Sequence, residues 1–198
     1  MPKEKEAVDG RRARTERSKQ EIIEATLSLM EEGVLIPTAQ QISDRAGVNI
    51  RSFFRHYDDM ETLFATIDEH IRGSTEALFL GGDRDGSVEE RILHAVEQRA
   101  NGYEERSNMI LSTAAQLWRS KTLRQNYARY QRGLRKDLSD WLPELEQLTR
   151  GQREAVDAIA SFEMWHRLRY HQGLDRTMAV DVMVDVLHAV IRDKTGRQ

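Results

Sequence analysis

Three arginines and no acidic residue lie between residues 45 and 57, at Arg45, Arg51 and Arg55. A guanidinium group presents a fork of N–H donors that can bond two phosphate oxygens, or the O6 and N7 atoms of a guanine. Ser52 and His56 lie in the same stretch, and their side chains are suited to phosphate contacts. The segment therefore indicates binding to nucleic acid.

Two short helices joined by a tight turn are expected to position these side chains. Thr38 can accept a hydrogen bond at the start of the first helix, and Gln41, three residues on, completes a capping box. Gly47 lies where the chain must turn, a position that often requires a positive φ. Asn49 can then cap the second helix. This pattern predicts a helix-turn-helix whose second helix enters the major groove of DNA.

The second helix divides into a buried and an outward face. Phe53 and Tyr57, one turn apart, share the buried face. On the outward side, Arg51 suits guanine, and Ile50 suits a thymine methyl group. Phe54 can contact a sugar or a thymine methyl, or can be partly packed. The expected DNA-binding residues are Thr38, Gln40, Asn49, Ile50, Arg51, Ser52, Phe54, Arg55 and His56. An ordinary helical hairpin is the alternative, and the purely basic outward face favours DNA.

The segment from Arg17 to Phe64 resembles the DNA-binding signature of the TetR family of transcriptional regulators. The matching residues are Gly33, Thr38, Ile42, Ala46-Gly47-Val48, Phe53-Phe54, His56-Tyr57 and Glu61-x-Leu63. The resemblance implies an all-helical bacterial homodimer that reads DNA with its amino-terminal domain and binds a small effector in its carboxyl-terminal domain. Family members usually have Tyr at the position of Phe54 and Lys at that of Met60, so it implies no phosphate contact from these two side chains.

Composition fits a cytosolic helical protein. The 198 residues are 39% hydrophobic and 32% charged, with no cysteine that could form a disulfide or a thiolate metal site. No apolar run reaches the ~18 residues of a membrane span. The net charge is −3, but residues 11–19 hold five basic residues against one acid. Binding depends on where charge lies, so the negative total does not exclude DNA.

The expected architecture is all-α, with about nine helices. Residues 1–14 are expected to be a disordered basic arm that can enter the minor groove or only aid solubility. A three-helix domain over residues 15–58 should bind DNA, and residues 59–198 should form a helical domain for effector binding and dimerisation.

Local signals place several boundaries in this second part. Asp58 and Glu61 have capping-box spacing, as do Ser87 and Glu90. The glycine-rich segment 81–86 reads as a flexible loop. A new helix is expected to start at Ser107 or Asn108, and one helix is expected to run from about Arg150 to His171.

Aromatic and soft side chains in the second part are candidates for an effector pocket. They are Tyr103, Met109, Trp118, Tyr127, Phe162, Trp165 and His166. Such a lining suits an apolar or aromatic effector, with Arg119, His166 or Arg169 orienting a polar end. Ordinary core or dimer-interface packing is the alternative. The expected dimer-interface residues are Phe162, Trp165, Met178, Val182, Val186 and Val190.

Two readings from other classes remain. Glu163 with His166, and Asp185 with His188, have the carboxylate-x-x-His spacing of di-iron helical bundles. With six histidines and 33 acidic residues such pairs are expected by chance, and neither a catalytic motif nor a cofactor motif is evident. The third possibility is an architectural protein that binds DNA without sequence preference.

Overall fold

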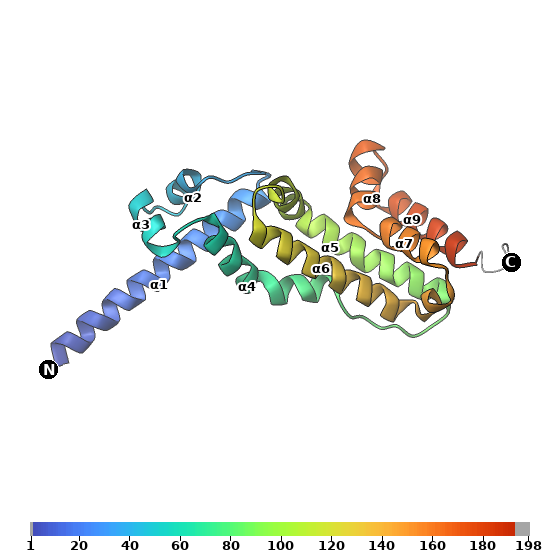
Figure 1. Cartoon of the computed structure of the whole chain (residues 1–198), viewed down its shortest axis with the longest axis horizontal. Coiled ribbons are helices and arrows are strands. Elements are labelled where there is room, and N and C mark those ends of the chain that lie inside the picture. Colours follow the sequence, from blue (N-terminus) through green and yellow to red (C-terminus); the bar gives the residue numbers. More distant parts are fainter. Residues whose placement is uncertain (1, 193–198) are drawn as a thin grey trace. The chain divides into compact units, whose positions relative to one another are not determined.

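The computed structural model describes residues 2–192, with side chains from Ala13 onwards. Within this range the chain is all-helical, as expected, with nine α-helices and no strand. The elements are α1 (Pro2–Glu31), α2 (Ala39–Arg45), α3 (Ile50–His56), α4 (Met60–Phe79), α5 (Val88–Gln116), α6 (Lys121–Trp141), η1 (Pro143–Gln147), α7 (Arg150–Ile159), α8 (Phe162–His166), η2 (Arg167–His171) and α9 (Arg176–Arg192) (Figure 1). Met1, the side chains of Arg11 and Arg12, and residues 193–198 lie outside the description.

The chain folds into two compact units. Unit 1 comprises residues 1–72 and 106–127, and unit 2 comprises residues 73–105 and 128–198. Helices α4, α5 and α6 each contribute to both units. The boundary expected after residue 58 therefore falls inside unit 1, which combines the amino-terminal helices with the start of α4 and with segments of α5 and α6.

The core of unit 1 explains why its two shortest helices form. Helices α2 and α3 have seven residues each, and isolated helices of this length are marginal in water. Ile22 of α1, Ile42 of α2, Phe53 of α3 and Leu63 of α4 are fully buried in one cluster. Burial of one apolar face fixes both short helices and leaves their other faces in solvent.

Hydrogen bonds join residues 106–127 to the amino-terminal part of unit 1. The Asn108 side chain donates to the Glu31 carbonyl oxygen at 2.7 Å, and the Ser112 hydroxyl donates to the Leu35 carbonyl oxygen at 2.9 Å. The Thr122 backbone N–H donates to the Glu61 carboxylate at 2.8 Å. Each bond satisfies a backbone group at a helix end or in the connector before α2.

Residues 1–14 were expected to form a disordered arm, whereas the structure includes residues 2–14 in α1, which begins at Pro2. The segment is rich in Lys, Glu, Ala and Arg, which have high helix propensity, and Gly10 is its only strongly unfavourable residue after Pro2. The arm is therefore a continuation of α1.

Two expected boundaries in the middle of the chain also differ. Helix α5 continues through residues 107 and 108, and no new helix starts there. Ser107 is buried within α5 and is not a helix cap. Asp59, not Asp58, caps α4 by accepting the Thr62 N–H at 2.8 Å. Glu61 is thereby left to bond the start of α6. Ser87 and Glu90 do form the expected reciprocal bonds at the start of α5.

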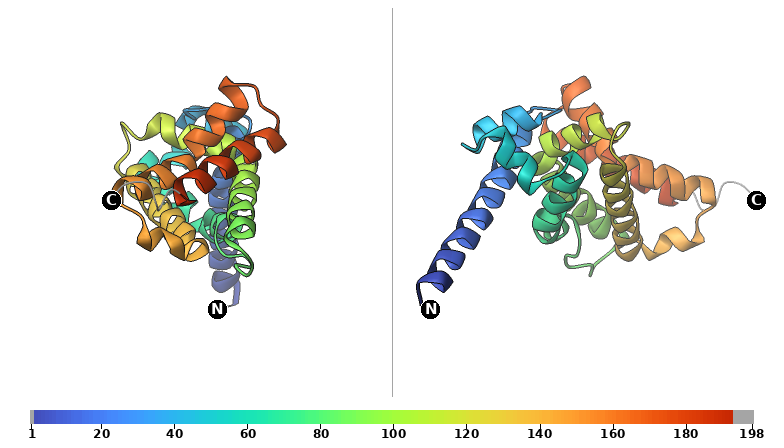
Figure 2. Two further views of the ribbon diagram at one scale, coloured as in Figure 1. Left: turned by 90° about the vertical axis from the view of Figure 1, so that its right-hand side faces the viewer. Right: turned by 60° about the vertical axis from the view of Figure 1, so that its left-hand side comes forward.

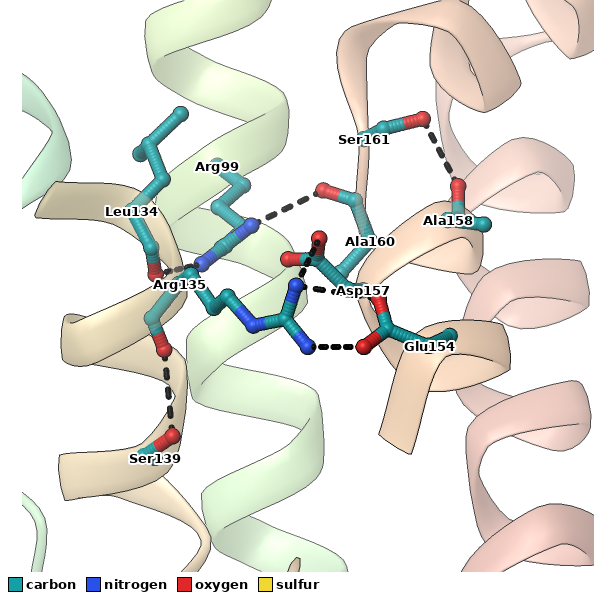
Figure 3. Close-up of polar contacts among 9 residues, drawn as sticks. All are labelled: Arg99, Leu134, Arg135, Ser139, Glu154, Asp157, Ala158, Ala160 and Ser161. Atoms are coloured by element: carbon teal, nitrogen blue, oxygen red, sulfur yellow. Dashed lines mark hydrogen bonds and ion pairs between the residues drawn. The ribbon is translucent and has the colours of Figure 1, made fainter. Parts of the chain in front are cut away.

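In unit 2, the helix expected over residues 150–171 is interrupted at Ala160. In a continuous helix the Ala160 carbonyl oxygen would accept the N–H four residues on. It instead accepts from the Arg99 guanidinium at 3.0 Å and from the Tyr103 hydroxyl at 2.9 Å. Ser161 then caps α8 by accepting the Met164 N–H at 3.3 Å. Figure 3 shows Arg99 reaching both Ala160 and Leu134.

Helices α7 and α9 lie side by side in both sets of views (Figures 1 and 2). The segment 81–86 is a loop, as expected, and two of its residues are hydrogen-bonded to α6. The buried Asp137 carboxylate accepts from the Gly81 N–H at 3.1 Å and from the Arg84 guanidinium at 2.6 Å. Arg84 also lies over the ring of Trp141.

Candidate nucleic-acid interface

Helix α2 and the turn after it have the expected geometry. The Thr38 hydroxyl accepts the Gln41 N–H at 3.2 Å, and the Gln41 side chain accepts the Thr38 N–H at 3.0 Å, which confirms the capping box. Gly47 has φ +65°, with no atom within 4 Å of the place where a Cβ would stand. Glycine is therefore favoured at residue 47 by backbone conformation and not by lack of space.

Asn49 starts the second helix, as expected. Its side chain accepts the Ser52 N–H at 2.8 Å, so α3 begins at Ile50 with one of its unpaired donors satisfied. Phe53 and Tyr57 are buried in the unit 1 core. These contacts fix the rotation of α3 about its axis and hence the face that it turns to solvent.

Three side chains dominate that solvent face. Arg51, Phe54 and Arg55 are all exposed and lie at positions i, i+3 and i+4, which share one side of a helix. The Phe54 side chain is exposed over 50% of its area, and the Arg55 guanidinium donates to the Ser52 hydroxyl at 3.2 Å. We call Arg51, Phe54 and Arg55 the α3 face. It offers two cationic forks and one aromatic ring on one side of the helix.

The other predicted DNA-binding residues have different surroundings. Thr38 and Gln40 are exposed, but Thr38 is engaged in the cap and the Gln40 side chain donates to Asp44 at 2.7 Å. Asn49 is likewise occupied with a backbone N–H. Ile50 is only partly exposed and packs against the unit 1 core. These four side chains support α2 and α3 more directly than they extend the α3 face.

His56 is half-buried at the end of α3. Its Nε2 atom is buried and has no hydrogen-bond partner within the described residues. Burial lowers the pKa of His56, and the nearby positive charges of Arg55 and Lys19 lower it further. The lowered pKa favours the uncharged form of the ring at neutral pH.

Arg45 has a structural contact that the sequence did not indicate. Its guanidinium donates to both carboxylate oxygens of Glu32, at 2.6 and 2.7 Å, and to the Ser28 hydroxyl at 2.7 Å. The pair raises the pKa of Arg45 and lowers that of Glu32. The pair joins the end of α1 to the end of α2, so Arg45 stabilises the packing of these two helices within unit 1. The two partners lie 13 positions apart in the sequence, a separation that carries no secondary-structure signal.

The candidate effector residues divide between the two units. Met109, Trp118 and Tyr127 belong to unit 1, where Trp118 is exposed over 77% of its side chain. Unit 2 brings together Tyr103, Phe162 and His166 in a row of rings that also includes Phe79 and Tyr170. Neighbouring ring centroids in this row are 4.6–5.6 Å apart. The buried Trp165 lies beneath the Arg169 guanidinium. We call the five-ring row the aromatic row.

The candidate dimer residues also divide. Phe162 and Trp165 are buried inside unit 2, so they have little surface to offer a partner and belong to the core. Met178 is exposed over 50% of its area. The remaining residues are partly exposed at four-residue spacing along α9, namely Val182, Val186 and Val190. This stripe is an apolar surface on one side of a helix.

The two carboxylate-x-x-His pairs are not joined in a common site. Glu163 and Asp185 are exposed, and His166 stacks on Tyr170 with ring centroids 4.6 Å apart. Among the side chains that the structure describes, no group of three or more His, Asp or Glu residues is placed to hold a metal ion. Burial lowers the pKa of His166, and His171 lowers it further.

The fold has a known relative among solved structures. The chain is similar to a transcriptional regulator from Rhodococcus sp. Rha1, with a TM-score of 0.62 and 16% sequence identity, over 88% of this chain and 96% of that one. No family model and no curated protein matches the sequence. None of the helices within residues 2–192 has the length and apolar character needed to cross a bilayer.

Proposed function

We propose that this protein is a TetR-like transcriptional regulator, a repressor of the bacterial cytoplasm that binds a palindromic DNA operator as a homodimer. The α3 face carries the proposal. It is basic, outward and held by caps and a buried core, as a helix that enters the major groove must be. The fold that the chain shares with a transcriptional regulator supports the same function. Neither observation requires a catalytic role for any residue.

Each side chain of the α3 face has a different task in this proposal. Arg51 forms a bidentate contact with guanine O6 and N7. Arg55 bonds phosphates and positions α3 on the duplex without reading the base sequence. Residues 11–19 of α1 add positive charge to the same unit, which strengthens attraction to the duplex at low salt.

Selection of bound DNA from a random pool tests the proposal. The selected sequences should contain two related half-sites, and Arg51→Ala should weaken operator binding by ~1–3 kcal/mol and relax the preference at one base position. Arg153→Ala is the control, since Arg153 is an exposed arginine of unit 2 and its loss makes the same change in net charge. Equal weakening on every DNA sequence would make Arg51 a phosphate contact only.

The homodimer is proposed to form through the α9 stripe of Met178, Val182, Val186 and Val190. Two copies would present two α3 helices to half-sites about 34–36 Å apart, or a multiple of this distance, on one side of the DNA. Val186→Asp places a charge in the stripe and should convert dimers to monomers in sedimentation experiments. It should also reduce operator affinity. The exposed Asp185→Asn, one residue away, should leave the dimer intact.

Effector control is proposed to act through unit 2. The aromatic row makes a small apolar or aromatic compound the expected class of effector. Such a ligand releases the operator only if it prefers a conformation in which the two α3 helices no longer match the half-sites. Screening compounds against the protein–operator complex tests this step. A compound that binds the protein without changing operator affinity would not be an effector.

Architectural DNA binding is the competing function. A regulator should prefer its operator over unrelated DNA by ~10³-fold or more at physiological salt. Equal affinity for the operator and for unrelated DNA, with an affinity that falls steeply as salt rises, would instead identify an architectural protein.

A further inference from the structure

The α3 face exposes one large apolar ring. Phe54 is exposed over 50% of its area between the two arginines Arg51 and Arg55. Its ring has no polar atom and cannot donate to a phosphate. Single exposed apolar side chains are common on proteins, but this one lies on the surface that the proposed function places against a duplex.

The ring is also held in place. Phe54 contacts the fully buried Phe53 edge-to-face, with centroids 5.2 Å apart and an interplanar angle of 81°. This is a favoured geometry for aromatic pairs. Phe54 thus has few conformations to lose when it meets a ligand, and a preformed contact costs less to make.

Ile50 differs from Phe54 in this respect. The sequence makes Ile50 the natural partner of a thymine methyl group, but its side chain packs against the unit 1 core. Phe54 is the large apolar side chain of α3 that the core leaves exposed. An apolar contact with DNA from α3 therefore falls to Phe54.

The major groove has one kind of apolar group on its base edges, the C5-methyl group of thymine. We propose that Phe54 determines sequence specificity by packing against this methyl group in each half-site. The inference rests on the proposed function, since it requires that α3 enter the groove. Three residues of helix separate Phe54 from Arg51, a rise of about 4.5 Å. The thymine should therefore lie within one or two base pairs of the guanine that Arg51 reads.

Replacement of thymine by deoxyuridine tests the inference directly, since it removes the methyl group and keeps every hydrogen-bonding atom. Each thymine of the selected operator is replaced in turn, and affinity is measured by fluorescence anisotropy with the full-length protein. One position per half-site should lose about fourfold, the value of one buried methyl-sized group, and replacement in both half-sites should lose about fifteenfold. The other thymines should show no loss.

Protein variants assign the methyl contact to a residue. With Phe54→Ala, thymine and deoxyuridine operators should bind equally well at the sensitive position, although both bind more weakly than to the wild type. Phe54→Leu keeps an apolar side chain and should retain part of the difference. Ile50→Val removes one methyl group from a core-facing side chain and should retain the full fourfold ratio.

The possible failures are distinct. If no deoxyuridine replacement weakens wild-type binding, Phe54 touches a sugar or nothing, and the inference is overturned while the proposed function stands. If Phe54→Ala keeps the fourfold ratio and Ile50→Val loses it, Ile50 reads the methyl group and the inference is wrong. If the wild type binds no sequence preferentially, the inference and the proposed function both fail. The wild-type replacements alone decide between methyl and sugar, even if Phe54→Ala does not fold.

Discussion

Both units contain the same helix-starting device but differ in what stabilises the rest. Thr38 with Gln41 in unit 1, and Thr149 with Gln152 in unit 2, form capping boxes with nearly equal distances. Unit 1 combines such short-range bonds with hydrogen bonds from the uncharged side chains of Asn108 and Ser112 to backbone carbonyl oxygens 77 positions away. Unit 2 has instead the buried, charged guanidinium of Arg99. It donates to the carbonyl oxygens of Leu134 and Ala160, which lie 35 and 61 positions further along the chain.

This difference corresponds to what each unit leaves exposed. Caps bond only the first turn of a helix, so α2 and α3 keep an open side, which the proposed function places against DNA. Arg99 bonds backbone groups from inside unit 2, where it connects α5 with α6 and with the α7–α8 break. The comparison predicts that changes to unit 2 affect folding most, whereas changes to unit 1 affect DNA binding as well.

The largest effect is expected for Arg99→Met. It leaves the Leu134 and Ala160 carbonyl oxygens without their charged donor, at a cost of about 2–4 kcal/mol in the free energy of unfolding. Trp141 and Trp165 lie in unit 2 and Trp118 lies in unit 1, so tryptophan fluorescence during urea unfolding follows both. Arg135→Met is the control, because the exposed Arg135 pairs with Glu154 at the surface and should matter much less. Equal losses would contradict the assigned role of Arg99.

The matched capping boxes give the next largest effect. Thr38→Ala and Thr149→Ala should each reduce stability by about 1 kcal/mol, because each removes one helix cap. Only Thr38→Ala should also weaken operator binding, since only α2 braces α3. Anisotropy with operator DNA, at a temperature where both variants are folded, separates the two consequences. Equal loss of affinity in both variants would remove the distinction between the units.

Two buried tyrosines should respond with opposite signs. The Tyr103 hydroxyl donates to Ala160 at 2.9 Å, so Tyr103→Phe should lose about 1 kcal/mol of stability. The Tyr57 hydroxyl is buried without a partner among the described residues, so Tyr57→Phe should be neutral or stabilising by up to about 1 kcal/mol. Chemical unfolding of both variants at pH 7 measures the pair. A destabilised Tyr57→Phe would indicate a bound water at that hydroxyl.

The smallest effect is a pH dependence of unit 1. The pKa of His56 is lowered by burial, so the folded state binds fewer protons than the unfolded state once the pH falls below about 6.5. Its contribution to stability is complete above that pH and decreases as the pH falls through the lowered pKa. His56→Gln should reduce the difference between unfolding midpoints at pH 7.5 and pH 5.5. His166→Gln is the matched variant in unit 2, where burial lowers the pKa in the same way.

The helix-turn-helix could be predicted because its signals are local. A helix cap and the residue whose N–H it accepts lie three positions apart, and Gly47 marks the turn by its residue type. The pattern can therefore be recognised without knowledge of the fold. The break at Ala160 could not, since its donors come from α5, 57 and 61 residues away. Ser107 is a residue type that often caps helices, but it is buried inside α5.

The candidate site was predicted less completely than the fold. Arg51 and Arg55 are exposed on α3, as their spacing indicated. Arg45 carries the same charge, but it is paired with Glu32, the residue that follows α1, and nothing in the intervening sequence marks the partner. Phe162 and Trp165 have apolar helical spacing, which is the same for a core and for a dimer surface. Only their burial within one chain distinguishes the two.

The bonds from Asn108, Ser112 and Thr122 to residues 31, 35 and 61 have a practical consequence for protein engineering. A fragment that stops at residue 72 would lack all three donors and would expose backbone acceptors at the end of α1 and in the connector before α2. The part of this chain that is proposed to bind DNA is thus not one contiguous segment. A chimaera that is to keep its operator preference must transplant residues 106–127 together with the first 72.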